Sequence, residues 1–230
     1  MRLTRTFLVI GVTVLGLGSA GASAAPPNPG IVPIGAVAHG HTYGELAAAW
    51  WKWATETPTP ENALVDETGA NCAVNQKTSG VWFLAGTFGG TVTRTCTVPK
   101  GTFLYIPLAN DLYGAFLTDP PDQRTEAFVR SQTECIVGAV MSAQIDGVAV
   151  NDPSQYLEQS PLFTIHLPTD NVFGVTADQV PALTLDPSVD RGYYLYITPL
   201  TPGRHTLHFT TAAGSSCATP QDVTYHLTIK

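Results

Sequence analysis

The C-terminal part of the chain is a succession of short runs rich in aromatic and β-branched residues: YYLYI at 193–197, RHTLHFT at 204–210 and VTYHLTI at 223–229. A fourth run of this kind, LFTIHL at 162–167, precedes them. Such runs are typical of β-strands when turn formers such as Thr201-Pro202-Gly203 separate them. Several strands of this length and spacing predict a β-sandwich or a jelly roll.

Strand signals continue toward the N-terminus. The run VWFLA at 81–85 is apolar at every position, as expected for a strand that is covered on both faces. The run at 91–98 alternates instead, with four threonines on one side and Val92, Arg94, Cys96 and Val98 on the other. A further strand is expected at 103–108, and Asp146-Gly147 predicts a two-residue hairpin turn.

Two helices are expected. Thr42 and Glu45 have the spacing of a capping box, which predicts a helix at 43–56 that ends before Pro58. A second helix is predicted at about 122–143 from an apolar stripe made of Phe128, Cys135, Ile136, Ala139 and Val140. The predicted fold class is therefore mainly β, a β-sandwich or jelly-roll-like domain with these two helices.

The four tryptophans divide into two groups. Trp50 and Trp53 fall on the apolar face of the first helix and Trp82 lies in an apolar strand, so all three are predicted to be core residues. Trp51 points to another side of the helix. An exposed indole can stack on a sugar or a peptide, which makes Trp51 a candidate ligand-binding residue.

The N-terminus has the order of a signal peptide. Arg2 and Arg5 precede an uncharged run at 7–18, and small residues then lead to Ala24. The apolar run is too short to span a bilayer, and no later stretch approaches the roughly 20 apolar residues that a spanning helix needs. We therefore expect a signal peptide at 1–24 cleaved near Ala24, an extended arm at 25–38, one domain at 39–230, and a secreted or periplasmic protein without membrane insertion.

The charge balance argues against nucleic acids and anionic membrane surfaces as partners. All 18 acidic residues follow residue 24, whereas 2 of the 11 basic residues precede it, so the part after the leader carries a formal charge of −9. Nucleic acids and anionic membrane surfaces both require clustered lysine and arginine. Nucleic acid is therefore not expected as a partner.

The four cysteines predict two disulfides, because an even number in an exported chain is typical of a disulfide framework. Three pairings are formally open. Cys72 and Cys96 flank two strand-like runs joined by Gly89-Gly90, so a hairpin would bring them together. We therefore predict Cys72 with Cys96 and Cys135 with Cys217.

Three sequence blocks resemble a family of uncharacterised exported bacterial proteins. They are YGELAAAWWKWATETP at 43–58, VWFLAGTFGG at 81–90 and LTPGRHTLHF at 200–209. The resemblance implies an exported bacterial origin. It implies no activity, because that family has no assigned reaction or site.

The histidines are the most informative polar residues. Strand alternation places His208 and His226 on outward-facing positions, and His166 as well, so these three are candidate ligands for a divalent metal; no cofactor is otherwise predicted. His39 and His41 would share a side of an extended segment, and they join Glu45 as candidate ligand-binding residues. The favoured interpretation of all these histidines is that they are ordinary surface or loop residues, and metal binding is the alternative.

The carboxylates suggest structural roles first. Glu45 fits helix capping, and Asp66, Glu67 and Asp111 lie near turn formers, where acidic residues commonly stabilise turns. A pair of carboxylates acting as acid and base is the alternative.

The favoured function is that of an exported, non-catalytic protein that binds a small molecule, an extracellular wall polymer or a partner protein. The alternative is a secreted hydrolase or metal-dependent enzyme that uses histidine and carboxylate side chains, although no GxSxG, HExxH, P-loop or EF-hand motif follows the leader. A structural subunit, suggested by the N-terminal arm, is a third class. An enzyme should gather several of these side chains in one concave site, whereas a binding protein should scatter them: His39, His41, Glu45, His166, His208 and His226.

Overall fold

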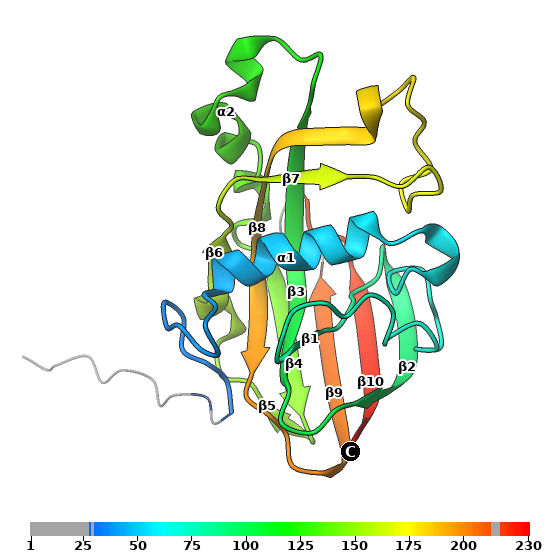
Figure 1. Cartoon of the computed structure of the whole chain (residues 1–230). Coiled ribbons are helices and arrows are strands. Elements are labelled where there is room, and N and C mark those ends of the chain that lie inside the picture. Colours follow the sequence, from blue (N-terminus) through cyan, green and yellow to red (C-terminus); the bar gives the residue numbers. More distant parts are fainter. Residues whose placement is uncertain (1–27, 29, 213–216) are drawn as a thin grey trace, which may run out of the picture.

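The computed structural model describes residues 28, 30–212 and 217–230, which form two β-sheets and a covering helix (Figure 1). The first sheet has the strand order β1-β3-β8-β6, and β7 also pairs with β8. Its strands are β1 (Val81–Phe83), β3 (Phe103–Phe116), β6 (Leu157–Gln159), β7 (Phe163–His166) and β8 (Thr184–Ile197).

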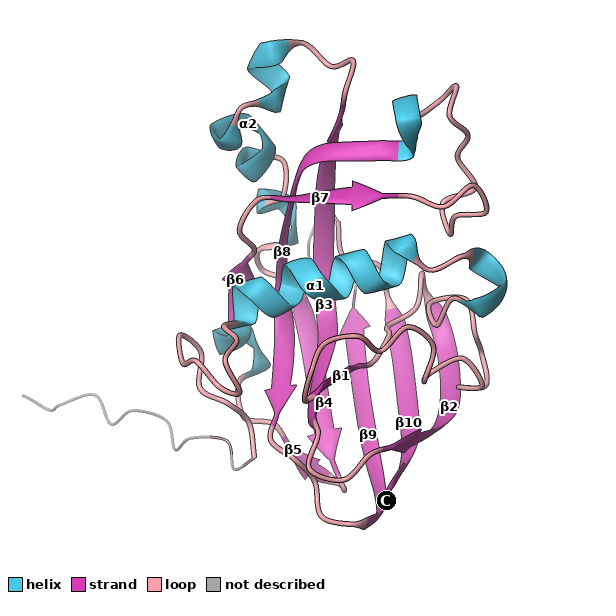
Figure 2. Ribbon diagram, viewed as in Figure 1, coloured by secondary structure: helices cyan, strands magenta, loops and turns pink. Residues whose placement is uncertain are grey.

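The second sheet has the strand order β2-β10-β9-β4-β5. Its strands are β2 (Gly90–Val98), β4 (Val140–Ile145), β5 (Val148–Ala149), β9 (Gly203–Ala212) and β10 (Gln221–Ile229). Both sheets are mixed, because β1 runs parallel to β3 and β2 runs parallel to β10, while the other pairs are antiparallel (Figure 2). The expected mainly β, sandwich-like fold is confirmed.

Helix α1 (Tyr43–Glu56) lies across the first sheet and makes a third layer (Figure 1). Its aromatic side chains pack on a cluster of sheet tyrosines; the ring centroids of Tyr43 and Tyr196 are 5.7 Å apart, and those of Tyr105 and Tyr194 are 5.0 Å apart. The predicted capping box is present, with Thr42 Oγ1 accepting from the amide of Glu45 and Glu45 Oε2 accepting from the amide of Thr42. The hydrogen bonds from Thr42 hold the pKa of Glu45 below its usual value.

The second sheet separates polar from apolar residues as its alternation predicts. Val92, Arg94, Cys96 and Val98 are buried on β2, whereas the four threonines between them are exposed. Arg94 is buried because its guanidinium donates to the carbonyls of Ala85, at 2.7 Å, and Asp66, at 2.6 Å. Asp66 also stabilises its own turn, as predicted, because its carboxylate accepts hydrogen bonds from the amides of Thr68 and Asn71.

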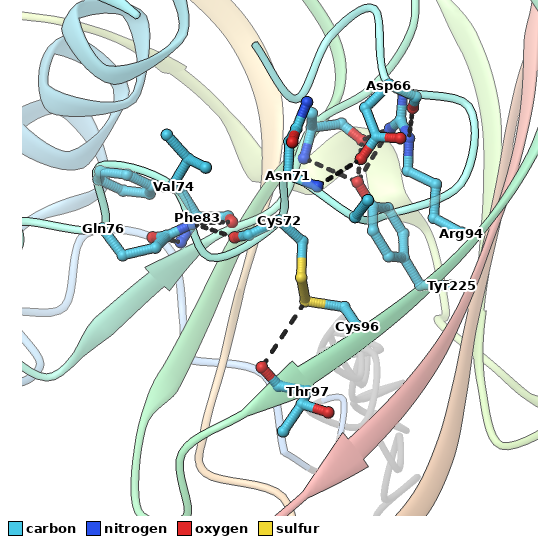
Figure 3. The surroundings of a disulfide bond; sticks show 12 residues. Asp66, Asn71, Cys72, Val74, Gln76, Phe83, Arg94, Cys96, Thr97 and Tyr225 are labelled. Atoms are coloured by element: carbon cyan, nitrogen blue, oxygen red, sulfur yellow. Dashed lines mark hydrogen bonds between the residues drawn. A yellow bond between two sulfur atoms is a disulfide. The ribbon is translucent and has the colours of Figure 1, made fainter. Parts of the chain in front are cut away.

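Both predicted disulfides are confirmed. Cys72–Cys96 ties the loop that follows α1 to the inner face of β2, beside Arg94 (Figure 3). Cys135–Cys217 ties the region before β4 to the segment that leads into β10. The two disulfides indicate an oxidising compartment.

The second helix is much shorter than predicted. Helix α2 covers only Glu126–Ser131, flanked by the 3-10 turns Pro121–Arg124 and Glu134–Ile136, and β4 begins at Val140. Gly138 has a φ of +87°, a left-handed conformation that ends the helical region and lets the chain enter the second sheet. The prediction of a helix from the apolar stripe is wrong at its C-terminal end, because Val140 belongs to a strand. The remaining 3-10 turns are Thr59–Glu61, Pro153–Tyr156 and Pro181–Leu183.

The predicted arm at 25–38 is attached to the domain where it is described. Ile31 and Val32 are buried, and the amide of Val32 donates to the carbonyl of Tyr196. Asn28 Nδ2 donates to the carbonyl of Asn151. Over these residues the arm is therefore docked on the domain and is not free, which removes the observation that suggested a structural subunit. The expected signal peptide lies outside the described residues. No helix within the described ranges is long and apolar enough to cross a membrane.

Candidate functional site

A cleft of about 290 Å³ opens where β1 and β3 stop running side by side. Its walls are the loop at 86–88 that follows β1, the part of β3 at 107–112, and the segment at 217–221 that leads into β10. Trp50 and Trp51 of α1 also line it. We call it the Asp111 cleft, because Asp111 is the only ionisable residue among the described residues that line it.

Two phenylalanines flank the cleft. Phe88 comes from the loop after β1, and Phe173 from the loop between β7 and β8. Their exposed fractions are 54% and 40%, which is high for such large apolar side chains. Exposed aromatic rings beside a cavity are typical of a surface that contacts a ligand or a partner.

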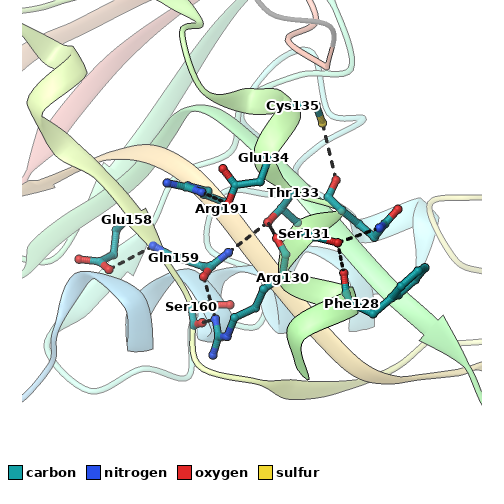
Figure 4. Close-up of polar contacts among 11 residues, drawn as sticks. Phe128, Arg130, Ser131, Thr133, Glu134, Cys135, Glu158, Gln159, Ser160 and Arg191 are labelled. Carbon is teal, nitrogen blue, oxygen red and sulfur yellow. Dashed lines mark hydrogen bonds and ion pairs between the residues drawn. The ribbon is translucent and has the colours of Figure 1, made fainter. Parts of the chain in front are cut away.

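Asp111 is half-buried in this cleft. Desolvation by burial raises the pKa of its carboxyl group, and a hydrogen bond from the amide of Leu112 opposes that shift. Arg191 is its partner residue across the β3–β8 ladder, but the Arg191 guanidinium forms an ion pair with Glu134 instead (Figure 4). Among the described residues no ion pair includes Asp111.

From its neighbours in the sequence, Asp111 was expected to stabilise a turn, and that expectation is wrong. Asp111 lies within β3, which continues to Phe116 rather than ending near Leu108 as predicted. The pair Asn110-Asp111 interrupts the apolar pattern without ending the strand, because β8 keeps pairing with it. A polar pair inside a strand was the signal that could have identified the cleft.

A second carboxyl group lies behind the cleft. Asp190 is fully buried, and it accepts a hydrogen bond of 2.5 Å from Trp51 Nε1 and one of 2.7 Å from the hydroxyl of Tyr194. Asn110 Nδ2 donates to the same hydroxyl at 3.2 Å. Burial raises the pKa of Asp190 to about 8. Asp190 therefore positions residues that line the cleft and does not itself reach solvent.

Trp51 is not the exposed residue that its position on the helix predicted. Its side chain is only 8% exposed, because the second face of α1 is covered by β8 and by Asp190. Trp50 and Trp53 are core residues as predicted, and Trp82 is partly buried against the core. Trp51 still lines the cleft, so its role as a candidate ligand-binding residue stays a prediction.

The disulfide Cys135–Cys217 borders the cleft beside Asp111. Asp111 Oδ2 is 3.3 Å from Cys135 Sγ, and Cys217 also lines the cleft. These three residues are the group of potential metal donors that lie within 4.8 Å of one another in the described part of the chain. Both sulfurs belong to the disulfide, so the group offers one carboxylate and no thiolate, which is a poor metal site.

The candidate metal-binding histidines do not come together. His208 and His226 lie on the same outer face of β9 and β10, as predicted, but the register pairs His208 with Thr224 and His226 with Thr206. They are thus diagonal neighbours, and His208 Nε2 contacts Asp222 Oδ1 at 2.9 Å. His166 belongs to β7 in the other sheet.

His39 and His41 lie in a tight turn rather than in an extended segment. The amide of Ala38 donates to the carbonyl of His41, and His39 has a φ of +49°. The ring of His39 lies 5.5 Å from that of Phe103, and Glu45 caps α1. None of these three candidate ligand-binding residues lines the Asp111 cleft.

Comparisons with known proteins add little. No protein-family model and no curated protein matches the sequence. The cysteine protease inhibitor EhICP2 from Entamoeba histolytica is 12% identical with a TM-score of 0.25, over 65% of this chain and 96% of that one. PbICP-C, solved in complex with falcipain-2, is 11% identical with a TM-score of 0.27, over 65% of this chain and 98% of that one. Scores this low carry no argument about function.

Proposed function

We propose that this is an exported β-sandwich protein that binds a ligand, a wall polymer or a partner protein in the Asp111 cleft. The bound part carries a cationic or hydrogen-bond-donating group that faces the carboxylate of Asp111. An adjoining apolar part packs against Phe88 and Phe173.

The observation that carries this proposal is the unpaired carboxyl group of Asp111 in a concave, partly aromatic site. Holding a carboxylate half-buried without a cation costs free energy, and such groups are concentrated at functional sites. The cleft of about 290 Å³ is at the lower end of the size range of small-molecule pockets. A bound cation would offset the desolvation of Asp111.

The distribution of the other polar groups also supports binding over catalysis. The candidate histidines and Glu45 are spread over the N-terminal turn, α1, β7 and the outer face of the second sheet. Scattering of these side chains is what we expect of a binding protein. Export is supported by the basic and apolar N-terminal pattern and by the two disulfides.

A matched pair of small probes tests this proposal. Cyclohexylmethylamine is cationic at neutral pH, whereas cyclohexylmethanol has nearly the same shape and no charge. Tryptophan fluorescence can follow both titrations, because Trp50 and Trp51 line the cleft. We expect the amine to bind about 5-fold more tightly, as for an ion pair of about 1 kcal/mol in a partly desolvated site.

The variant Asp111→Asn keeps the shape of the side chain and removes its charge, so it should abolish the preference for the amine. Asp222→Asn is the control, because Asp222 is a carboxylate on the outer face of the second sheet. Equal affinities of the two probes for the unmodified protein, or a preference that survives Asp111→Asn, would refute the proposal.

A further inference from the structure

Beside the Asp111 cleft, one edge of strand β3 has no strand partner among the described residues. β1 pairs with β3 only from Phe103 to Tyr105, and on that side no other described strand pairs with the rest of β3. The first part of this edge is covered, because the carbonyl of Leu108 accepts from Thr211 Oγ1 and from Gln221 Nε2. From Asn110 to Gly114 the strand is only half-buried.

The hydrogen bonding of β8 shows which backbone groups of β3 face this edge. Asp190 lies opposite Leu112 in the ladder, yet its amide and carbonyl bond to Ser160 on the far side of β8. Asp190 and Leu112 are therefore a non-hydrogen-bonded pair, so the amide and carbonyl of Leu112 point away from β8. Because this direction alternates along a strand, those of Asn110 and Gly114 also point to the edge. The amide of Leu112 is hydrogen-bonded to the carboxyl group of Asp111, so its carbonyl is the group that an added strand can reach without competing with Asp111.

A second cavity follows the Asp111 cleft along the same edge. It has a volume of about 300 Å³ and apolar walls that include Leu167, Val180 and Leu185. The two hollows share Leu112 and Phe173. The groove that they form has a carboxylate near one end and an apolar cavity at the other, and the open backbone of β3 runs past both.

We propose that this groove binds an extended peptide segment of a partner protein, which pairs as an added strand with Asn110–Gly114 of β3. A lysine or arginine of the segment lies beside Asp111, and a neighbouring apolar side chain enters the second cavity. Charge complementarity and the open edge favour this occupant over a compact small molecule: main-chain hydrogen bonds supply affinity, and the two hollows supply specificity. This inference rests on the proposed function of the Asp111 cleft.

The faces of β3 define the sequence that the segment should carry. Asp111 projects to one face of the strand, whereas Leu112 and Gly114 lie on the opposite face with Asp190. Side chains of an added strand alternate in the same way. The basic residue and the apolar residue should therefore be separated by an odd number of positions, and adjacent positions are the simplest case.

The test uses a phage-displayed library of random dodecapeptides, panned on the immobilised mature protein, with Asp222→Asn as the control protein and Asp111→Lys for counter-selection. We expect enriched peptides with a basic residue next to an apolar one. Synthetic copies should bind at least 10-fold more weakly to Asp111→Asn than to the control. N-methylation of alternate amides should weaken binding at least 10-fold in one register and leave it nearly unchanged in the other, since only every second amide of an added strand faces β3.

Two results would contradict the proposal that a peptide pairs with β3 as an added strand. One is that no peptide is enriched relative to Asp111→Lys; the other is that both N-methylation registers bind alike. If the preference for cyclohexylmethylamine remains in either case, the cleft binds small ligands, so the proposed function stands while the peptide inference fails. If both assays are negative, both proposals fail.

Discussion

The indole nitrogen of Trp51 donates a 2.5 Å hydrogen bond to the carboxyl group of Asp190, which lies 139 residues later in the chain. This contact joins α1 to the middle of β8 behind the Asp111 cleft. Tyr194 and Asn110 extend it as a chain of hydrogen bonds that reaches the cleft wall. A buried carboxyl group therefore fixes residues that the proposed ligand would contact.

The first prediction concerns Trp51. Trp51→Ala should lower the free energy of unfolding by about 3–5 kcal/mol, because it removes a large buried side chain. Trp51→Phe should cost about 1–3 kcal/mol, because it keeps most of the packing but leaves a buried acceptor on Asp190 without its donor. Urea denaturation of both variants measures these losses. If Trp51→Ala leaves the free energy of unfolding unchanged, the indole is not part of the core.

The second prediction concerns the pH dependence of stability. Burial raises the pKa of Asp190 to about 8, whereas its value in the unfolded chain is near 3.8. The folded state thus binds this proton more tightly, so this group's contribution to stability falls as the pH rises from about 4 to about 8. Asp190→Asn cannot titrate and should show a smaller decline over this range than the unmodified protein. Parallel pH profiles in urea denaturation would contradict this assignment.

The third prediction concerns His205, whose Nδ1 contacts Asp146 Oδ2 at 2.7 Å and whose Nε2 contacts the carbonyl of Thr201 at 2.8 Å. Burial lowers the pKa of His205, but the bonds to Asp146 and Thr201 outweigh it and raise the pKa overall. The stabilisation is fully present below the unfolded pKa of about 6.5 and is lost as the pH rises through the higher folded value. His205→Gln should therefore destabilise the protein more at pH 5.5 than at pH 8.5.

The control for this experiment is His226→Gln, because His226 is exposed on the outer face of β10. It should change stability little, as expected for an exposed side chain. An effect of His205→Gln that does not depend on pH would mean that packing alone explains its role.

The fourth prediction concerns the disulfides. The unmodified protein should show no free thiol when denatured without reductant, since all four cysteines are paired. Replacing Cys72 and Cys96 together by serine should cost about 3 kcal/mol, because the crosslink restricts the unfolded chain. Thiol titration and urea denaturation measure the two results. A titratable thiol in the unmodified protein, or an unchanged stability of the double variant, would contradict the prediction.

Local signals in the sequence were sufficient for much of the fold. The capping box of Thr42 and Glu45, the alternation of β2 and the pairing of Cys72 with Cys96 all depend on residues close together in the chain. Such features follow from backbone hydrogen bonding and from the two-residue period of a strand.

The remaining features depend on contacts between distant segments. The burial of Trp51 requires Asp190, and the docking of Val32 requires Tyr196, so neither can be read from local periodicity. The apolar stripe at 128–140 fits a helix, but pairing of Val140 with Ala212 places its end in the second sheet. The residues that line the Asp111 cleft come from six separate segments of the chain, which explains why no motif marks it.

The most direct test of the central claim is the pKa of the Asp111 carboxyl group, measured by ¹³C NMR with and without cyclohexylmethylamine. In the free protein desolvation should hold this pKa above the ordinary value of about 3.8, and the bound cation should lower it because it stabilises the carboxylate. A pKa of Asp111 that is unchanged at saturating amine would show that this carboxylate does not hold the ligand.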